Sequence, residues 1–472
     1  MKKKLFIAIL SFILMTFIVG CTNTKYEVEF IVNDSIEEVI EVEDGQTVNK
    51  IDDPVSEDYL FLGWYTSDNY EEKFNFNQEI KSDKTIYAAF SHFKLGEENY
   101  IAFKENDLYG FMLPTGEVVI EAIYERAEPF RYGYALVYKG EISYYIDALG
   151  NKIYEQSGYL ASGQKWELQF SKDGLAIVRM DDAIKVIDTE GSVHSEITLP
   201  EDVSLPAGTY IEDGRILDFK FNHQKSAYEC IYLDMTGDIV LEDSYLQCSP
   251  FVNGLAAVKI VTGSYEQNNL KSTYHFITPD GEIMIETNLS NIKPMFDGIR
   301  RVFYKDGFAI GVLNQSDFSY PRYVVIDDQG EIVVEFENDI PVDVYDGYVL
   351  TKNSEGYYAI FDLEGNIIMD YLYQGSRDSR YAMAISDGLV VLRNDNDLYG
   401  AIDVNTGDLV IDFTYESLLT FIDGYAVAQM NGLYGIIDKD NNVIVDFIYE
   451  DMFSVAKTYN RSCFPSDFFC NY

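Results

Sequence analysis

Carboxylates are the side chains with which this chain could do the most chemistry. It has 79 Asp and Glu residues, enough to supply the acid pair of a glycoside hydrolase or the oxygen ligands of calcium. Residues 438–442 (Asp-Lys-Asp-Asn-Asn) begin like a calcium loop, but Val443 and Tyr449 stand where that loop needs glycine and glutamate. Residues 394–397 (Asn-Asp-Asn-Asp) are similarly incomplete. No two carboxylates stand out as a pair, so we expect no catalytic residue, no metal ligand and no cofactor.

Histidines give no stronger signal for chemistry. None of the four pairs with another at metal-ligand spacing, and the chain has no nucleophile-elbow phrase and no phosphate-binding glycine loop. They stand at positions far apart: His92, His194, His223 and His275. The sequence therefore predicts a protein that is not an enzyme, with a carboxylate hydrolase as the weaker alternative.

The net charge limits the kinds of partner that this protein could bind. It is -44, and removing Lys2, Lys3 and Lys4 with a leader would lower it to about -47. A nucleic-acid binder needs a basic surface to contact phosphates, so we expect no nucleic-acid partner. The charge also argues against lying flat on anionic lipid. Solubility and like-charge repulsion explain it most simply, and attraction of cationic ligands is the alternative.

The first residues predict export and a lipid anchor. Three lysines precede an apolar run from Leu5 to Val19, which is shorter than the about 20 residues that span a bilayer. The end of this run, Ile18-Val19-Gly20-Cys21, resembles the bacterial lipobox. The resemblance implies a signal peptide over residues 1–20, a lipid on Cys21 and a tether over 21–25. The expected location is extracytoplasmic, at the bacterial cell membrane. A plain signal peptide or an N-terminal anchor helix is the alternative.

The other cysteines leave two readings open. Apart from Cys21, four remain, an even number in an oxidising compartment. Cys230 and Cys248 fall inside one repeat and Cys463 and Cys470 lie in the tail, so two local disulfides are candidates. Four free or partly buried thiols are an equal alternative, because nothing has metal-site spacing.

Residues 26–91 form a distinct module. It begins with the alternating strand residues Tyr26, Val28, Phe30 and Val32 and a turn at Asp44-Gly45. It then carries Val48, Pro54, Phe61-Leu62-Gly63-Trp64-Tyr65, Phe74-Asn75-Phe76 and a closing strand Ile86-Tyr87-Ala88-Ala89-Phe90. This series resembles the Listeria–Bacteroides repeat of bacterial surface proteins, with Asp58 and Phe90 as departures from its pattern. The resemblance implies a small β-grasp-like fold.

Beyond this module a turn glycine followed by a short apolar strand recurs at steps of 41, 40, 40, 44, 49, 41 and 36 residues. A fixed period of that size predicts an array of small units, each too small to bury its apolar face alone. The glycines are Gly133, Gly174, Gly214, Gly254, Gly298, Gly347, Gly388 and Gly424.

A second phrase, an aspartate three residues before a glycine, lies between these glycines. The aspartate can bond the backbone ahead of it and the glycine accepts positive φ, which together predict a tight hairpin. The clearest copies are Asp147 with Gly150, Asp188 with Gly191, Asp234 with Gly237, Asp327 with Gly330, Asp362 with Gly365 and, with one extra residue, Asp403 with Gly407. Variants at 113–116, 278–281 and 438–441 bring the number of predicted hairpins to nine.

A tyrosine often stands four residues before the aspartate, and in Tyr109-Gly110, Tyr399-Gly400 and Tyr434-Gly435 a glycine follows it. A ring beside a glycine suits a close approach of two strands or units. Together with the two phrases, this pattern resembles the WG-repeat family over residues 96–456, with tyrosine in place of the family's tryptophan. Residues 457–472 lose every mark of the repeat and are either a degenerate cap or an atypical end.

The predicted fold is all-β: a small β-grasp-like module, then eight to nine hairpin units of three or four strands each. The units could form a propeller-like ring or an open superhelix. Their unequal lengths, and ends that show no evident strand exchange, favour the open array. The expected function is non-catalytic binding or scaffolding for an extracellular or envelope ligand, protein or glycan. A purely structural spacer is the main alternative.

Overall fold

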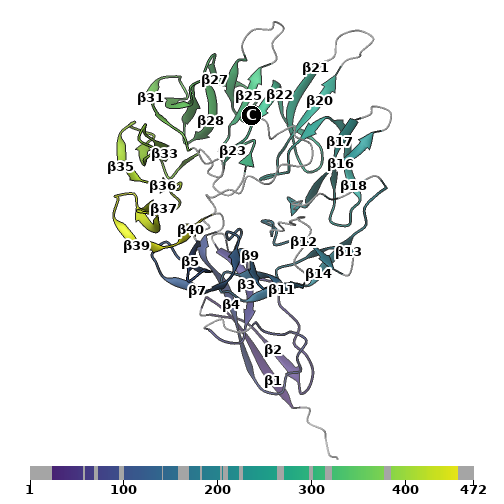
Figure 1. Cartoon of the computed structure of the whole chain (residues 1–472). Helices are drawn as coiled ribbons and strands as arrows, with labels where there is room; N and C mark the ends of the chain where they lie inside the picture. The colour runs from purple at the N-terminus through teal and green to yellow at the C-terminus, as the bar shows by residue number, and fades with distance from the viewer. Residues whose placement is uncertain are drawn as a thin grey trace, which may run out of the picture. The chain divides into compact units, whose positions relative to one another are not determined.

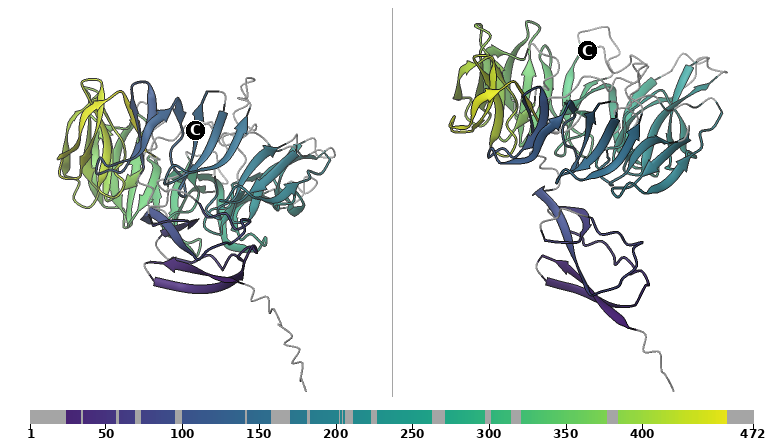
Figure 2. Two further views of the ribbon diagram at one scale, coloured as in Figure 1. Left: turned by 90° about the horizontal axis from the view of Figure 1, so that it is seen from below. Right: turned by 60° about the horizontal axis from the view of Figure 1, so that its bottom comes forward.

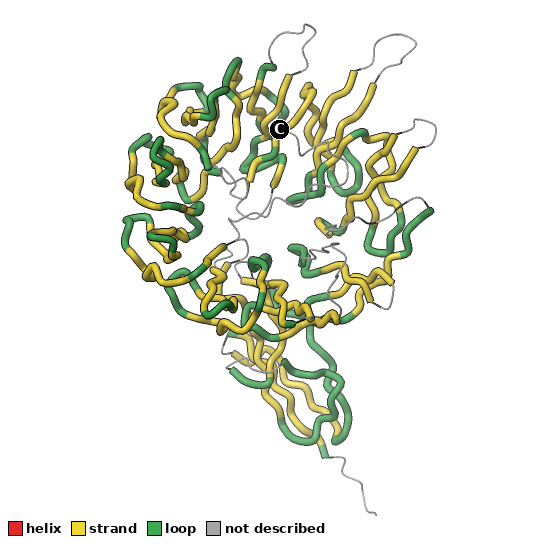
Figure 3. Tube along the Cα trace, viewed as in Figure 1, coloured by secondary structure: helices red, strands yellow, loops and turns green. Residues whose placement is uncertain are grey.

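A computed structural model of the chain describes residues 24–33, 35–56, 59–68, 73–94, 100–140, 142–157, 170–180, 183–201, 203, 205, 211–222, 227–262, 271–296, 301–313, 321–376 and 384–454. These residues form strands, turns and loops (Figure 3). None of them belongs to a helix long and apolar enough to cross a bilayer. The described residues divide into two compact units, one within Met1–Pro54 and Gly63–Ala89, the other within Val55–Leu62 and Phe90–Tyr472.

The N-terminal module is one mixed sheet of four strands in the order β2-β1-β4-β3. β1 runs parallel to β4 and antiparallel to β2, so the chain's first strand lies at the centre of the sheet. Phe30 and Trp64 fill the core, with ring centroids 5.0 Å apart in an edge-to-face contact. The strands are β1 (Lys25–Val32), β2 (Ser35–Glu43), β3 (Tyr59–Tyr65) and β4 (Lys84–Lys94).

The second unit repeats one design nine times, and we call each copy a blade. In most copies a short first strand leads through a tight turn into three antiparallel strands, whereas blade 1 takes its first strand from the other end of the array and blade 3 has three described strands. Blades 1 to 4 contain β40 (Asp451–Phe453), β5 (Ile101–Glu105), β6 (Leu108–Met112) and β7 (Val118–Tyr124); β8 (Arg126–Ala127), β9 (Tyr134–Lys139), β10 (Ile142–Asp147) and β11 (Lys152–Ser157); β12 (Ala176–Met180), β13 (Ala183–Ile187) and β14 (Val193–Ile197); and β15 (Ile211–Glu212), β16 (Arg215–Asn222), β17 (Ala227–Leu233) and β18 (Ile239–Tyr245).

Blade 6 departs from the design. The long strand β22 of blade 5 continues into blade 6 and pairs with β25, and a small hairpin, β23–β24, follows it. Blades 5 to 9 contain β19 (Gln247–Cys248), β20 (Ala256–Thr262), β21 (Lys271–Ile277) and β22 (Ile283–Lys293); β23 (Met295–Phe296), β24 (Arg301–Val302), β25 (Ala309–Leu313), β26 (Tyr323–Ile326) and β27 (Ile332–Phe336); β28 (Ile340–Tyr345), β29 (Tyr348–Lys352), β30 (Tyr357–Asp362) and β31 (Ile367–Gln374); β32 (Ile385–Ser386), β33 (Leu389–Arg393), β34 (Tyr399–Asp403) and β35 (Leu409–Tyr415); and β36 (Ser417–Leu418), β37 (Tyr425–Met430), β38 (Leu433–Asp438) and β39 (Val443–Tyr449).

Neighbouring blades share hydrophobic cores, because each blade is apolar on both faces. One core joins blades 2, 3 and 4, and further cores join 4 with 5, 5 with 6, 6 with 7, 7 with 8 and 8 with 9. Blades 1 and 2 meet through Phe111 and Phe130, whose ring centroids are 4.7 Å apart. This packing is what a repeat unit needs, since a single blade cannot bury either face alone.

The two ends of the array exchange a strand, so the expectation that they do not is wrong. β40 pairs antiparallel with β5 and supplies the first strand of blade 1. A shared core of blades 1 and 9 contains Phe103, Met112, Val427 and Met452. The pairing supports the propeller-like alternative over the open superhelix, and the blades follow one another around a ring in Figures 1 and 2. β40 could not be predicted from the sequence, because it has only three residues and follows the last repeat motif.

Except in blade 3, where Asp173 does not have a positive φ, the turns that join a first strand to a second strand share one geometry. Two successive residues have positive φ, the second of them glycine, as in Asn253-Gly254 and Asp423-Gly424. In blade 6 this turn is Asp306-Gly307, where Lys305 and Phe308 bridge around it. From the sequence, this turn was expected at Asp297-Gly298. That assignment is wrong, and residues 297–298 themselves lie outside the described residues. An Asp-Gly pair is a local signal, and the same dipeptide occurs nine residues earlier in the sequence.

Candidate functional site: the turn face and the pocket of blades 5 and 6

The aspartates singled out in the sequence lie in the turns between third and fourth strands. Oδ1 of Asp147 accepts from the backbone N–H of Leu149 at 3.0 Å and of Asn151 at 2.9 Å. Gly150 N–H donates to the Asp147 carbonyl at 2.9 Å. The same backbone bond closes the turns at Gly116, Gly191, Gly237, Gly281, Gly330, Gly365, Gly407 and Asn441. These carboxylates are therefore occupied by their own turns.

The aspartates of the other turn set tie one blade to the next, a role that the sequence did not indicate. Oδ2 of Asp213 accepts from the N–H of Gly254, the turn glycine of the following blade, at 2.7 Å. Oδ2 of Asp387 does the same for Gly424 at 2.6 Å. A carboxylate that accepts a backbone N–H makes a charge-assisted bond, so the turns stabilise their neighbours around the array.

Both sets of turns lie at one end of the blades. Four strands that alternate in direction place their first and third connections at the same end. Contacts between blades agree: Arg215 Nε donates to the carbonyl of Pro279 at 3.1 Å, and Lys439 Nζ donates to the carbonyl of Asp387 at 2.6 Å. We call this end the turn face. It is acidic because most turns of both types carry aspartate.

His275 and the acidic loop at Asp438 have structural roles. His275 is buried, with Nε2 3.0 Å from Thr273 Oγ1, and Nδ1 accepts from Thr287 N–H at 3.2 Å. Burial lowers the pKa of His275, which favours the neutral ring. Both Asp438 oxygens accept from its own turn, including Asn442 Nδ2 at 2.9 Å. Within the described ranges, no group of three His, Cys, Asp or Glu side chains could hold a metal ion. His194 is exposed, while the side chain of His92 and all of His223 lie outside the description.

Cys230 and Cys248 form a disulfide that joins β17 to β19. Both are buried in the core shared by blades 4 and 5. The bond therefore links the third strand of one blade to the first strand of the next. Cys21, Cys463, Cys470 and the tail over residues 457–472 lie outside the described residues.

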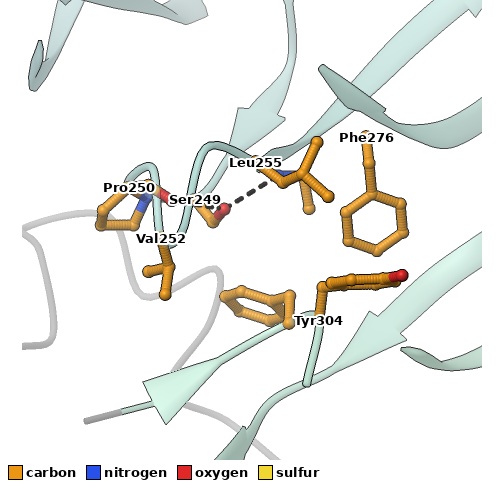
Figure 4. A pocket seen from close by; sticks show the side chains of 8 residues that line it. Ser249, Pro250, Val252, Leu255, Phe276 and Tyr304 are labelled. Atoms are coloured by element: carbon orange, nitrogen blue, oxygen red, sulfur yellow. Dashed lines mark hydrogen bonds between the residues drawn. The ribbon is translucent and has the colours of Figure 1, made fainter. Parts of the chain in front are cut away.

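A small pocket, open to solvent and with room for about one water molecule, lies between blades 5 and 6 (Figure 4). Apolar and aromatic residues dominate its lining, and the hydroxyl of Ser249 is engaged, accepting from Ala257 N–H at 2.9 Å and donating to the Pro250 carbonyl at 2.9 Å. Burial raises the pKa of Tyr304, and Asp328 and Asp327 raise it further. The lining residues are Ser249, Pro250, Val252, Leu255, Ala257, Phe276, Phe303 and Tyr304.

The sequence reading missed this pocket. Phe303 and Tyr304 carry no repeat mark, and they reach Leu255 only through the packing of two blades. The spacing of the turn glycines is the sequence signal that could have indicated an irregularity at this place. Gly254 and Gly307, the turn glycines of blades 5 and 6, are 53 residues apart, whereas the other turn glycines follow at 36 to 41.

Two buried carboxylates whose pKa values are raised lie elsewhere in the array. Asp343 on β28 receives Lys305 Nζ at 3.0 and 2.9 Å and Ile385 N–H at 2.8 Å. Burial raises the pKa of Asp343 to about 6, although Lys305 acts to lower it. Asp218 on β16 bonds its neighbour's N–H with Oδ1, and its Oδ2 has no partner within the described part of the chain. Burial raises the pKa of Asp218 to about 7.

The blades, their shared cores and the separate N-terminal sheet define a repeat-containing β-protein. Residues 26–89 match the Listeria-Bacteroides repeat domain, and residues 109–141, 399–434 and 434–457 match the WG containing repeat. The chain therefore carries one Listeria-Bacteroides repeat followed by WG containing repeats. No curated protein matches it in sequence.

Several solved structures are similar to parts of the chain. The computationally designed Ika8 protein is 14% identical with a TM-score of 0.36, over 68% of this chain and 95% of its own. BamB from Moraxella catarrhalis is 11% identical with a TM-score of 0.30, over 67% of this chain and 86% of its own. A structure described as the eukaryotic initiation factor is 10% identical with a TM-score of 0.37, over 77% and 91%. At these values no functional argument follows.

Proposed function

We propose that this chain is a non-catalytic binding or scaffold module for an extracellular or envelope protein or glycan. The observation that carries the proposal is the turn face: all nine blades present the turn between their last two strands at one end, and eight of them present a second turn beside it, on a frame fixed by shared cores and by bonds between turns. Binding residues sit well on loops that a rigid scaffold positions. The aspartates of this face have their structural bonds already, which leaves recognition rather than catalysis as the use of the surface.

The module would act outside the cytoplasm, held to the bacterial membrane by a lipid on Cys21. The basic start, the short apolar run and the lipobox-like Ile18-Val19-Gly20-Cys21 support this part of the proposal. In this layout, residues 1–20 are removed, 21–25 tether the protein, 26–91 form the first module and 96–456 form the blade array.

The test is a glycan and protein array probed with soluble Thr22–Tyr472, with and without calcium. A saturable, reproducible signal is expected in both conditions. A signal only with calcium would return the acidic loops at 394–397 and 438–442 to consideration as ligand sites. A blank in both conditions would overturn the binding proposal in favour of a structural spacer.

A further inference from the structure

The N-terminal module has a long strand with an open edge. β2 has nine residues and stands at one end of the order β2-β1-β4-β3, so among the described strands it pairs with β1 alone. Most of its residues are exposed, including the apolar side chains of Ile36 at 58% and Val39 at 45%. An edge strand of this kind offers backbone N–H and C=O groups to a further strand.

The pairing with β1 decides which backbone groups of β2 point away from the sheet. Asp44 N–H donates to the Thr24 carbonyl at 2.8 Å, and the register with β1 is unbroken over Glu38–Glu43. In an antiparallel pair, residues that bond their neighbour alternate with residues that do not. Counting back from Asp44, the N–H and C=O groups of Val39 and Glu41 therefore point toward the open edge.

The bond of Glu27 on β1 agrees with this alternation. Glu27 lies opposite Glu41, and its N–H turns away from β2 to the Asp83 carboxylate at 2.9 Å. The member of this pair on β2 must then direct its own backbone groups to the other side. Val39 and Glu41 together present two donors and two acceptors to a partner strand.

Three outer strands of the blade array show what a blunted edge looks like in this protein. β7, β35 and β39 also end their sheets, but register shifts interrupt their pairing with the third strand of the blade. Such bulges disrupt the ladder and protect an edge from further pairing. The one register shift of β2 lies between Phe30 and Ile31, beyond the unbroken stretch.

The side chains of β2 select the charge of a partner. The strand carries four glutamates, at positions 37, 38, 41 and 43, and no lysine or arginine. Glu41 pairs with Lys25 at 2.7 Å, whereas no ion pair reaches Glu37 or Glu38 from the residues that the structure describes. Two β2 strands side by side would set carboxylates against carboxylates, which disfavours a second copy of this chain. A strand with lysine or arginine is favoured for the same reason.

We propose that β2 receives an extended basic segment of a partner protein as a fifth strand of the N-terminal sheet. The backbone of the partner bonds the outward groups of Val39 and Glu41, and its lysine or arginine side chains meet the carboxylates of Glu37 and Glu38. Backbone bonds supply the affinity and charge supplies the selection of basic segments. This binding site goes beyond the turn face, because it lies on the other unit of the chain.

The test uses the full chain purified in a mild detergent and three fluorescein-labelled peptides, followed by fluorescence anisotropy. The peptides are Thr-Lys-Val-Lys-Val-Lys-Thr, the same peptide with its interior backbone nitrogens methylated, and Thr-Glu-Val-Glu-Val-Glu-Thr. Methylation removes the backbone donors and keeps every side chain and charge, so the first peptide should bind about tenfold more tightly than the second. The glutamate peptide should not bind. Equal binding of the two lysine peptides, binding of the glutamate peptide, or no binding of the first peptide would each overturn the proposal.

Val39→Pro removes an outward N–H and no bond to β1, and an edge strand tolerates proline where the N–H faces solvent. It should weaken the first peptide about tenfold, whereas Val39→Thr, which keeps the N–H and the branched side chain, should change binding less than twofold. Equal binding by the two variants would overturn the backbone pairing.

A charge reversal gives a second test that does not depend on proline. Glu38→Lys should weaken the lysine peptide about tenfold. Glu355→Lys is the matched control, because Glu355 is exposed in the turn between β29 and β30 of the array and the change in net charge is the same. Thermal unfolding of each variant checks the fold. Equal losses in Glu38→Lys and Glu355→Lys would mean that net charge alone attracts the peptide, and would overturn the site.

This proposal and the proposed function can fail separately. A blank glycan and protein array together with the expected peptide binding would overturn the turn face as a ligand surface and support β2. An array ligand unaffected by Val39→Pro, with no binding of the lysine peptide, would leave the proposed function in place and overturn the β2 site.

Discussion

Replacing Lys305 with methionine should destabilise the blade array by about 3–5 kcal/mol at neutral pH. The Lys305 side chain is 8% exposed and the Asp343 side chain 0%, so the substitution leaves a buried carboxylate without its cation. Methionine keeps an apolar stem of similar length, which limits the packing loss. The pair also spans three blades, because Lys305 precedes the blade 6 turn, Asp343 lies on β28 of blade 7, and Ile385 lies on β32 of blade 8.

The loss should depend on pH in a defined direction. The pKa of Asp343 is about 6 in the folded protein, above the ordinary value of 3.8, because of burial. A raised pKa stabilises the fold fully below about pH 4, and this stabilisation is lost as the pH rises through about 6. Without Lys305 the folded pKa rises further, since the ammonium acts to lower it. The difference between Lys305→Met and the parent should therefore be small near pH 4 and largest near pH 8.

Urea unfolding followed by tyrosine and tryptophan fluorescence at pH 4.5, 6 and 8 measures this effect. The double variant Lys305→Met/Asp343→Asn should lose less than Lys305→Met alone, because it removes the unpaired charge while the amide oxygen still accepts from Ile385 N–H. A change below about 0.5 kcal/mol at pH 8, no dependence on pH, or additive losses in the double variant would refute the reasoning.

Three further perturbations test other features. The parent should lose about 4 kcal/mol of stability between pH 4 and pH 8 through Asp218, because burial raises the pKa of this carboxyl from 3.8 to about 7, and Asp218→Asn should remove that loss. Thermal midpoints of parent and variant across this pH range measure the effect, and a difference that stays constant with pH would contradict it. Ending the chain at Glu450 removes β40 with the buried Met452 and Phe453, and should lower the free energy of unfolding in urea by about 3–6 kcal/mol. Ending the chain at Ser454 should change it little, and equal effects of the two truncations would speak against closure through β40. Cys21→Ala should release the protein from the membrane fraction into the medium, and continued membrane retention on fractionation would sink the lipid anchor.

Features that depend on neighbours in the sequence could be predicted. Asp147 and Gly150 set their turn through bonds that span four residues, so an aspartate three residues before a glycine is enough to recognise it. The pairing of tyrosine with glycine could also be predicted, because it depends on a close approach of strands within one blade. A Cβ on Gly435 would lie 2.5 Å from the Val445 carbonyl oxygen, within the same blade. These local rules gave the all-β class and the nine hairpins, and the motifs that they explain carry the resemblance to the WG-repeat family.

Features that depend on residues far apart in the sequence could not be predicted. The hydroxyl of Tyr109 donates to Asp451 at 3.0 Å across 342 residues, and nothing near either residue indicates the other. The sequence left open whether Cys230 and Cys248 form a disulfide or remain free thiols, and the packing of blades 4 and 5 brings them together as a disulfide. Asp306-Gly307 and Asp297-Gly298 carry the same dipeptide, and the bridge between Lys305 and Phe308 identifies the first of them as the blade turn.

The sequence by itself therefore determined the repeating unit, because a tight turn is built from side-chain and backbone bonds within a few residues. The tertiary structure decided the closure through β40, the bonds between successive turns, the ion pair of Lys305 with Asp343 and the pocket beside Tyr304. Each of these needs two blades in contact, and the apolar burial that brings blades together has no direction of its own. Which side chains then meet is fixed by the packed geometry of the array rather than by any local pattern of residues.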